Sequence, residues 1–132
     1  MKKIYWVLII FGVLLLAVIR FWTPEDTWIR NKKGEYVEHG KPPSLPSFVE
    51  EQQEAILKAL DLYGEKKQEG MEFNSQCLGI VYGGEIGYAV DMVNVPRNDE
   101  DNKPENQCEA YRTGEVKNFI ELDQEGNIFR IS

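Results

Sequence analysis

Oxygen-bearing side chains are concentrated in one short segment of this chain, PRNDEDNKPENQC. Asp99, Asp101 and Glu105 alternate there with asparagines, and carboxylate and amide oxygens are the ligands that calcium takes. The twelve-residue calcium loop needs an oxygen ligand at its fifth position and glycine at its sixth, where a loop starting at Asp99 has Lys103 and Pro104. We therefore predict no metal site and a solvated loop. The three acids are the candidate ligands if the loop does bind calcium, and the loop could also contact a partner.

Thiol chemistry is the second possibility, because the chain has two cysteines, Cys77 and Cys108, and one histidine, His39. A nucleophilic cysteine needs an imidazole within hydrogen-bond reach, and His39 lies among glycine and proline residues far along the chain from both cysteines. Two cysteines in a small domain outside the cytosol most simply form a disulfide. We predict a Cys77–Cys108 disulfide and no catalytic residue.

Paired carboxylates could hydrolyse a glycoside, but 22 acids in 132 residues make some pair inevitable, and no spacing singles one out. Asp91 differs from the others because it interrupts an apolar, strand-like run. It could pair with Arg97 or Arg112, face water at a sheet edge, or serve as a functional acid. A pocket that gathers Asp91, Glu121 or the acids of 99–105 would favour a hydrolase, and a flat polar surface would exclude one.

The elements that must position these residues follow from the change in hydrophobic period along the chain. The motif SFVE predicts a helix that begins at Ser47 with a capping box, runs to about Gln68 and ends at Gly70. Strand-like runs then follow at 77–82, 85–95, 115–122 and 128–132. With no helix expected between these strands, we predict an α+β domain in which one amphipathic helix packs on a roughly four-stranded antiparallel sheet.

The N-terminal segment is apolar from residue 4 to 19 and is followed by Arg20, Phe21 and Trp22. Its length and aromatic flanks favour an uncleaved transmembrane signal anchor over 1–22, which would contact the lipid bilayer through 4–22. A cleaved signal peptide and a buried helix are the alternatives. The predicted arrangement is a cytoplasmic N-terminus, a proline-rich stalk at 23–46 with room for a short hairpin, and an extracytoplasmic domain at 47–132.

The charge of the chain bears on its partners. There are 22 acidic residues against 15 basic ones, giving a formal net charge of −7. Nucleic-acid binding relies on basic side chains that neutralise phosphates, and this composition offers no such surface. We expect no nucleic-acid partner and no cofactor, and an envelope protein or polymer as the partner.

A sequence resemblance supports a location in the cell envelope. The pattern Trp28-Ile29, Gly34, Tyr36-Val37, His39-Gly40 and Pro42 resembles a short segment behind the N-terminal anchor of uncharacterised envelope proteins of small-genome bacteria. Those proteins commonly have Trp where this chain has Tyr36, and Cys where it has Arg30. The resemblance implies location and not activity.

The order of elements also resembles pilin-like proteins, although the proline-rich segment interrupts what would be their continuous helix. The sequence as a whole favours a non-enzymatic binding or structural role in the cell envelope. Pilin-like assembly and a carboxylate-based hydrolase of envelope polymers are the alternatives.

Overall fold

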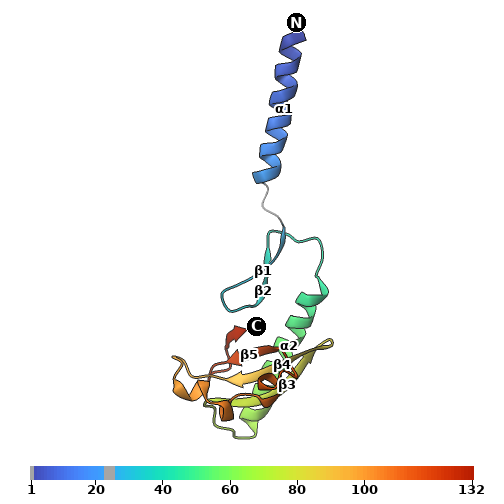
Figure 1. Cartoon of the computed structure of the whole chain (residues 1–132). Coiled ribbons are helices and arrows are strands. Elements are labelled where there is room, and N and C mark those ends of the chain that lie inside the picture. Colours follow the sequence, from blue (N-terminus) through green and yellow to red (C-terminus); the bar gives the residue numbers. More distant parts are fainter. Residues whose placement is uncertain (1, 23–25) are drawn as a thin grey trace.

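The structure is a computed structural model that describes residues 2–22 and 26–132. An N-terminal helix precedes a small two-stranded hairpin and an α+β domain (Figure 1). The helices and strands are α1 (Lys2–Trp22), β1 (Thr27–Arg30), β2 (Tyr36–His39), α2 (Ser47–Gln68), β3 (Gln76–Gly83), β4 (Ile86–Met92), α3 (Glu109–Arg112), β5 (Asn118–Leu122) and β6 (Ile128–Ile131). Two short 3-10 helices, η1 (Asp99–Asn102) and η2 (Pro104–Asn106), precede α3.

The main sheet is mixed, so the predicted antiparallel sheet is wrong. Its strand order is β3-β4-β5-β6, and β4 pairs with β5 in parallel while the two outer pairs are antiparallel. A parallel pair needs a connection of about a dozen residues or more to return the chain to the same end of the sheet. Residues 93–117 supply that length through η1, η2 and α3, where the sequence suggested a plain loop.

The helix α2 packs on one face of this sheet and builds the main core. Ala55, Ala59 and Tyr63 of α2 are buried against side chains from all four strands, including Val90 and Ile120, which are fully buried. The bounds of α2 match the predicted helix. Its predicted capping box is absent, because the carbonyl of the preceding proline accepts the first free N–H groups of the helix and no side chain caps them.

The connection between β4 and β5 covers the opposite face of the sheet. A second apolar cluster forms there from Ala89 and Phe119 of the sheet with Cys108 and Val116 of the connection. The predicted disulfide is confirmed: Cys77 of β3 is bonded to Cys108, with their Cα atoms 4.8 Å apart. The domain therefore has three layers, namely α2, the sheet and the connecting segment.

The hairpin of β1 and β2 is held against the domain through one buried glutamine. The Gln52 side chain, 1% exposed, donates to the Gly34 carbonyl at 3.0 Å and accepts from the Tyr36 amide at 2.8 Å. The Ile131 amide also donates to the Lys33 carbonyl at 2.6 Å. These contacts explain why the hairpin lies beside the C-terminus in Figure 1.

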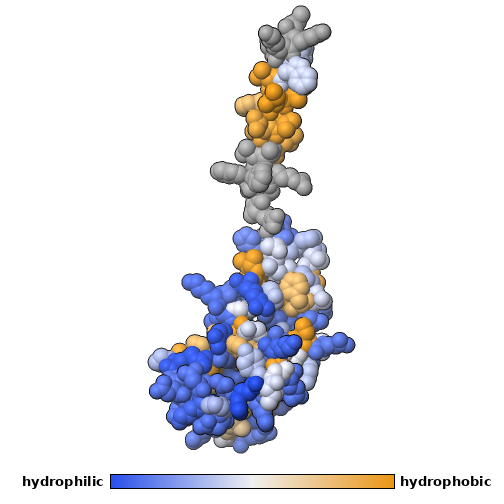
Figure 2. Space-filling model, viewed as in Figure 1, coloured by the Kyte–Doolittle hydropathy of each residue, from blue (hydrophilic) through white to orange (hydrophobic). Residues whose placement is uncertain are grey.

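The helix α1 lies apart from the domain, and its described side chains from Tyr5 to Leu16 are largely exposed apolar groups (Figures 1 and 2). A bilayer-spanning helix needs about 20 consecutive, predominantly apolar residues. Among the described residues, no helix combines the length and the apolar character that crossing a membrane requires. This finding corrects the predicted transmembrane anchor over 1–22, the bilayer contact through 4–22 and the single-pass membrane location.

Candidate functional site

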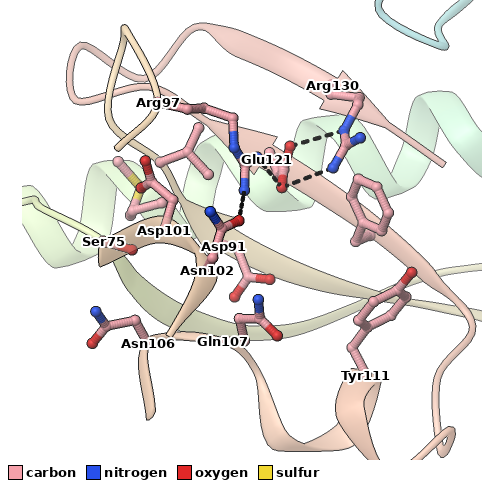
Figure 3. A pocket seen from close by; sticks show the side chains of 13 residues that line it. Ser75, Asp91, Arg97, Asp101, Asn102, Asn106, Gln107, Tyr111, Glu121 and Arg130 are labelled. Atoms are coloured by element: carbon pink, nitrogen blue, oxygen red, sulfur yellow. Dashed lines mark hydrogen bonds and ion pairs between the residues drawn. The ribbon is translucent and has the colours of Figure 1, made fainter. Parts of the chain in front are cut away.

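A polar pocket of about 200 Å³ lies on the face of the sheet opposite α2, between β4, β5 and the connecting segment (Figure 3). Its acidic and basic groups come from both the sheet and the connection, and its amide and aromatic groups come chiefly from the connection. The lining residues are Ser75, Asp91, Met92, Val93, Arg97, Asp101, Asn102, Asn106, Gln107, Tyr111, Phe119, Glu121 and Arg130.

The parallel pairing of β4 with β5 places two carboxylates side by side in this pocket. Asp91 and Glu121 are register partners, so their side chains project from the same face of the sheet. The neighbouring residues Val90 and Ile120 alternate to the α2 face and join the main core. This pair was not predictable from sequence spacing, because the strand pairing itself was not anticipated.

Two arginines hold Glu121 in place. Arg97 Nη1 donates to Glu121 Oε1 at 2.8 Å, and Arg130 donates from Nε to Oε2 at 3.0 Å and from Nη2 to Oε1 at 3.2 Å. The Glu121 side chain is 9% exposed, so the two guanidinium groups supply the charge compensation that burial requires. Arg130 also stacks over the Phe119 ring at 4.8 Å. The positive charge of both arginines is thus directed at Glu121.

Asp91 has a different environment. One of its oxygens, Oδ1, accepts the backbone N–H of Cys108 at 3.0 Å, and it has no ion pair among the described residues. The predicted pairing with Arg97 or Arg112 is wrong, because Arg97 contacts Glu121 and Arg112 donates to a backbone carbonyl. Burial raises the pKa of the Asp91 carboxyl from 3.8 to about 6; the Cys108 N–H opposes the rise, and the nearby charge of Glu121 adds to it.

The candidate calcium ligands do not face a common point. Asp101 is buried and turns inward, where it accepts the Asn94 amide at 2.9 Å and the Asn98 amide at 2.8 Å and so caps η1. Burial alone would raise the pKa of Asp101, but these N–H groups, with smaller help from Ser75 and Arg97, outweigh it and hold the pKa below its usual value. Asp99 and Glu105 are exposed. Asp101 therefore organises the loop that borders the pocket.

Metal-binding chemistry finds little support in the described residues. Their only group of three neighbouring ligand-type side chains is Cys77, Asp91 and Cys108, whose ligand atoms lie within 4.8 Å of one another. Both sulfur atoms in this group are already joined in the disulfide, so neither is a thiolate. His39 lies on β2 of the hairpin, outside the pocket lining.

From the sequence we singled out Asp91 and considered Glu121 as a second pocket acid, but we did not predict the residues that complete the pocket. Arg130 is on β6, and Gln107 and Tyr111 flank Cys108 on the connecting segment. The disulfide was the available signal, because a bond from Cys108 to β3 must hold the neighbouring residues against the sheet. Glutamine and tyrosine beside that bond carry no chemical pattern of their own.

No protein-family model, no curated protein and no solved structure matches this chain. The pocket is therefore the feature of this chain that bears most directly on its function.

Proposed function

We propose that the α+β domain is a ligand-binding module and that the pocket bordered by Asp91 and Glu121 is its binding site. The observation that carries this proposal is the convergence of partly unused hydrogen-bonding groups on one cavity of about 200 Å³. Within the described part of the chain, the Gln107 side chain, the Tyr111 hydroxyl and Asp91 Oδ2 have no hydrogen-bond partner, and all three belong to the lining (Figure 3). Concave sites with a few convergent polar groups are where proteins most often bind small molecules.

The framework of the pocket supports binding by being ordered before a ligand arrives. Glu121 is fixed by two arginines, Asp101 caps η1, and Cys108 ties the connecting segment to β3. A preformed site loses less conformational entropy when it binds, so more of the contact energy is available for affinity. The Gln107 side chain, the Tyr111 hydroxyl and Asp91 Oδ2 therefore need little rearrangement to contact a small molecule.

A carboxylate-based hydrolase is the second candidate, and one observation favours it. Asp91 and Glu121 lie side by side in a pocket, and burial raises the pKa of Asp91 to about 6, in the range of a general acid. The ion pairs of Glu121 argue against this activity, because both of its carboxylate oxygens already accept hydrogen bonds from the two arginines and are not free to attack a substrate. The test is whether the full chain hydrolyses aryl glycosides or aryl esters. If it does, and Asp91→Asn abolishes the hydrolysis, the hydrolase proposal replaces the binding proposal.

Thermal unfolding of the full chain in the presence of chemically diverse small molecules tests the binding proposal. A ligand at about 100 times its Kd that binds only the folded state stabilises it by about 2.7 kcal/mol, which raises Tm. We expect at least one class to raise Tm in the wild type and to do so less in Gln107→Ala. The matched control is Gln53→Ala, which removes an exposed glutamine from α2. If stabilising compounds act equally on both variants, they bind elsewhere and the proposal is wrong.

A further inference from the structure

We infer that the ligand of this pocket is a single neutral sugar residue, either free or at the end of a glycan, recognised through its hydroxyl groups. This inference rests on the proposed binding function and specifies the class of ligand. Three properties of the pocket carry it: the kind of hydrogen-bonding groups, the balance of charge, and the size and aromatic wall of the cavity.

The pocket groups with unused hydrogen-bonding capacity can both donate and accept hydrogen bonds. Gln107 and Asn102 each have an amide N–H₂ and a carbonyl oxygen, and the Tyr111 hydroxyl can act in either sense. Asn102 uses only its oxygen, which accepts from Arg97 at 3.4 Å. Asp91 adds an oxygen that accepts when ionised and carries a donor when protonated. A sugar hydroxyl is likewise a donor and an acceptor, so a ring bearing several hydroxyls can satisfy these groups together.

The charges of the pocket disfavour an anionic ligand. Phosphate and carboxylate ligands are usually held by arginine or lysine side chains that are free to form paired hydrogen bonds. Here Arg97 and Arg130 already donate to the buried Glu121, and Arg130 is further held over Phe119. An anion would have to compete with Glu121 or share its partners, and Asp91 would repel it once ionised. A neutral ligand meets neither obstacle.

The dimensions and the wall of the pocket fit one ring. Its volume of about 200 Å³ is below the roughly 300–1,000 Å³ typical of sites for drug-sized ligands. Tyr111 lies on one wall in a T-shaped arrangement with Phe119, at a centroid separation of 5.2 Å. An aromatic ring offers an apolar surface for the C–H groups of a sugar while its hydroxyl contacts the sugar oxygens. The Asp91, Asn102 and Gln107 side chains lie to one side of this ring (Figure 3).

The experiment is a ¹H–¹⁵N NMR and calorimetric titration of the full chain with defined compounds. One arm uses neutral hexoses, pentoses and N-acetylhexosamines, and a second uses short neutral oligosaccharides. Comparison arms use a uronic acid, a sugar phosphate, a primary amine and a free amino acid. We expect a neutral sugar to shift the amide signals of residues 106–111 and Asp91. Binding of the monosaccharide supports a free sugar, and binding of the oligosaccharide alone at the same amides supports a glycan end.

Matched variants assign the effect to the pocket. Tyr111→Phe keeps the ring and removes one hydroxyl, and Gln107→Ala removes one amide. Each should weaken sugar binding about three- to tenfold, which is the loss expected for one hydrogen bond. The controls Tyr82→Phe and Gln53→Ala alter exposed residues outside the pocket and should leave affinity unchanged.

Different results would contradict the sugar inference and the proposed binding function. If only the amine, the amino acid or an anion shifts the pocket signals, the pocket binds a ligand but the sugar inference is wrong. If no compound in any arm shifts them, both the sugar inference and the proposed binding function are wrong.

Discussion

Replacing Asp91 with asparagine should remove a pH dependence of folding stability that the pocket creates. The Asp91 carboxyl is partly buried on β4 and has no cationic partner, and burial raises its pKa from 3.8 to about 6. The folded protein therefore binds this proton more tightly than the unfolded chain does. The resulting stabilisation is fully present below about pH 4 and is lost as the pH rises through about 6. Asparagine keeps an oxygen that can accept the Cys108 N–H and carries no charge to bury.

The size of the effect follows from the two pKa values. Each pKa unit corresponds to 1.36 kcal/mol, so the difference between 3.8 and about 6 corresponds to about 3 kcal/mol. Relative to Asp91→Asn, the free energy of unfolding of the wild type should fall by up to about 3 kcal/mol from about pH 4 to about pH 7. The comparison isolates Asp91, because the opposite contribution of Asp101, whose pKa is lowered, is present in both proteins.

Urea unfolding of the full-length wild type and variant over this pH range measures the difference directly. The control Asp61→Asn removes an exposed carboxylate from α2 and accounts for the general loss of one negative charge. An NMR titration of the Asp91 side-chain carboxyl should give a midpoint near 6. If the stability difference between the wild type and Asp91→Asn is the same at every pH, the reasoning about burial on this face of the sheet is refuted.

Four other substitutions test separate parts of the fold. Glu121→Gln should lower the free energy of unfolding, measured by urea denaturation, by about 2–4 kcal/mol, because it leaves two arginines beside a neutral group. A loss below about 1 kcal/mol would show that the ion pairs contribute little to stability. Gln52→Ala should cost about 1–3 kcal/mol and speed amide hydrogen exchange in the hairpin, and unchanged exchange there would contradict the anchoring role. Gly83→Ala should destabilise by about 1–3 kcal/mol in thermal unfolding, since an added Cβ would overlap a backbone carbonyl of α2. Gly64→Ala, which has open space, should instead stabilise by about 0.5–1 kcal/mol; the same sign for both would contradict this account.

Local sequence signals predicted the helix of the domain well. The apolar period of this segment indicated the extent of α2. The turn at DQEGN joins β5 to β6 with Gly126 at a φ of 86°, a backbone conformation that favours glycine. These features depend on residues that are close in the chain, so their patterns are visible in one short segment.

The strand pairing and the pocket depend on residues that are distant in the chain. The acidic segment was interpreted as a loop from its composition, yet its length was sufficient for a parallel crossover, and that crossover places Asp91 beside Glu121. Asp101 and Asn98 look like calcium ligands in sequence and instead form a reciprocal cap on η1. Short polar side chains serve both purposes, so composition alone did not distinguish them.

The envelope-protein resemblance, the envelope partner and pilin-like assembly stay predictions. The residues of the resemblance fall in the hairpin and the turns around it, where Trp28 donates to the Ser44 carbonyl at 3.0 Å. The pilin-like comparison was made alongside the predicted antiparallel sheet, and β4 and β5 are instead parallel.

The central claim is that the pocket of Asp91 and Glu121 binds a small polar molecule. The most direct measurement is the ¹H–¹⁵N NMR spectrum of the full chain during titration with the neutral sugars and the comparison compounds. Our account predicts saturable shifts confined to the amides around the pocket, and their weakening in Tyr111→Phe but not in Tyr82→Phe. Spectra in which no compound shifts the pocket amides, or in which both variants respond like the wild type, would contradict it.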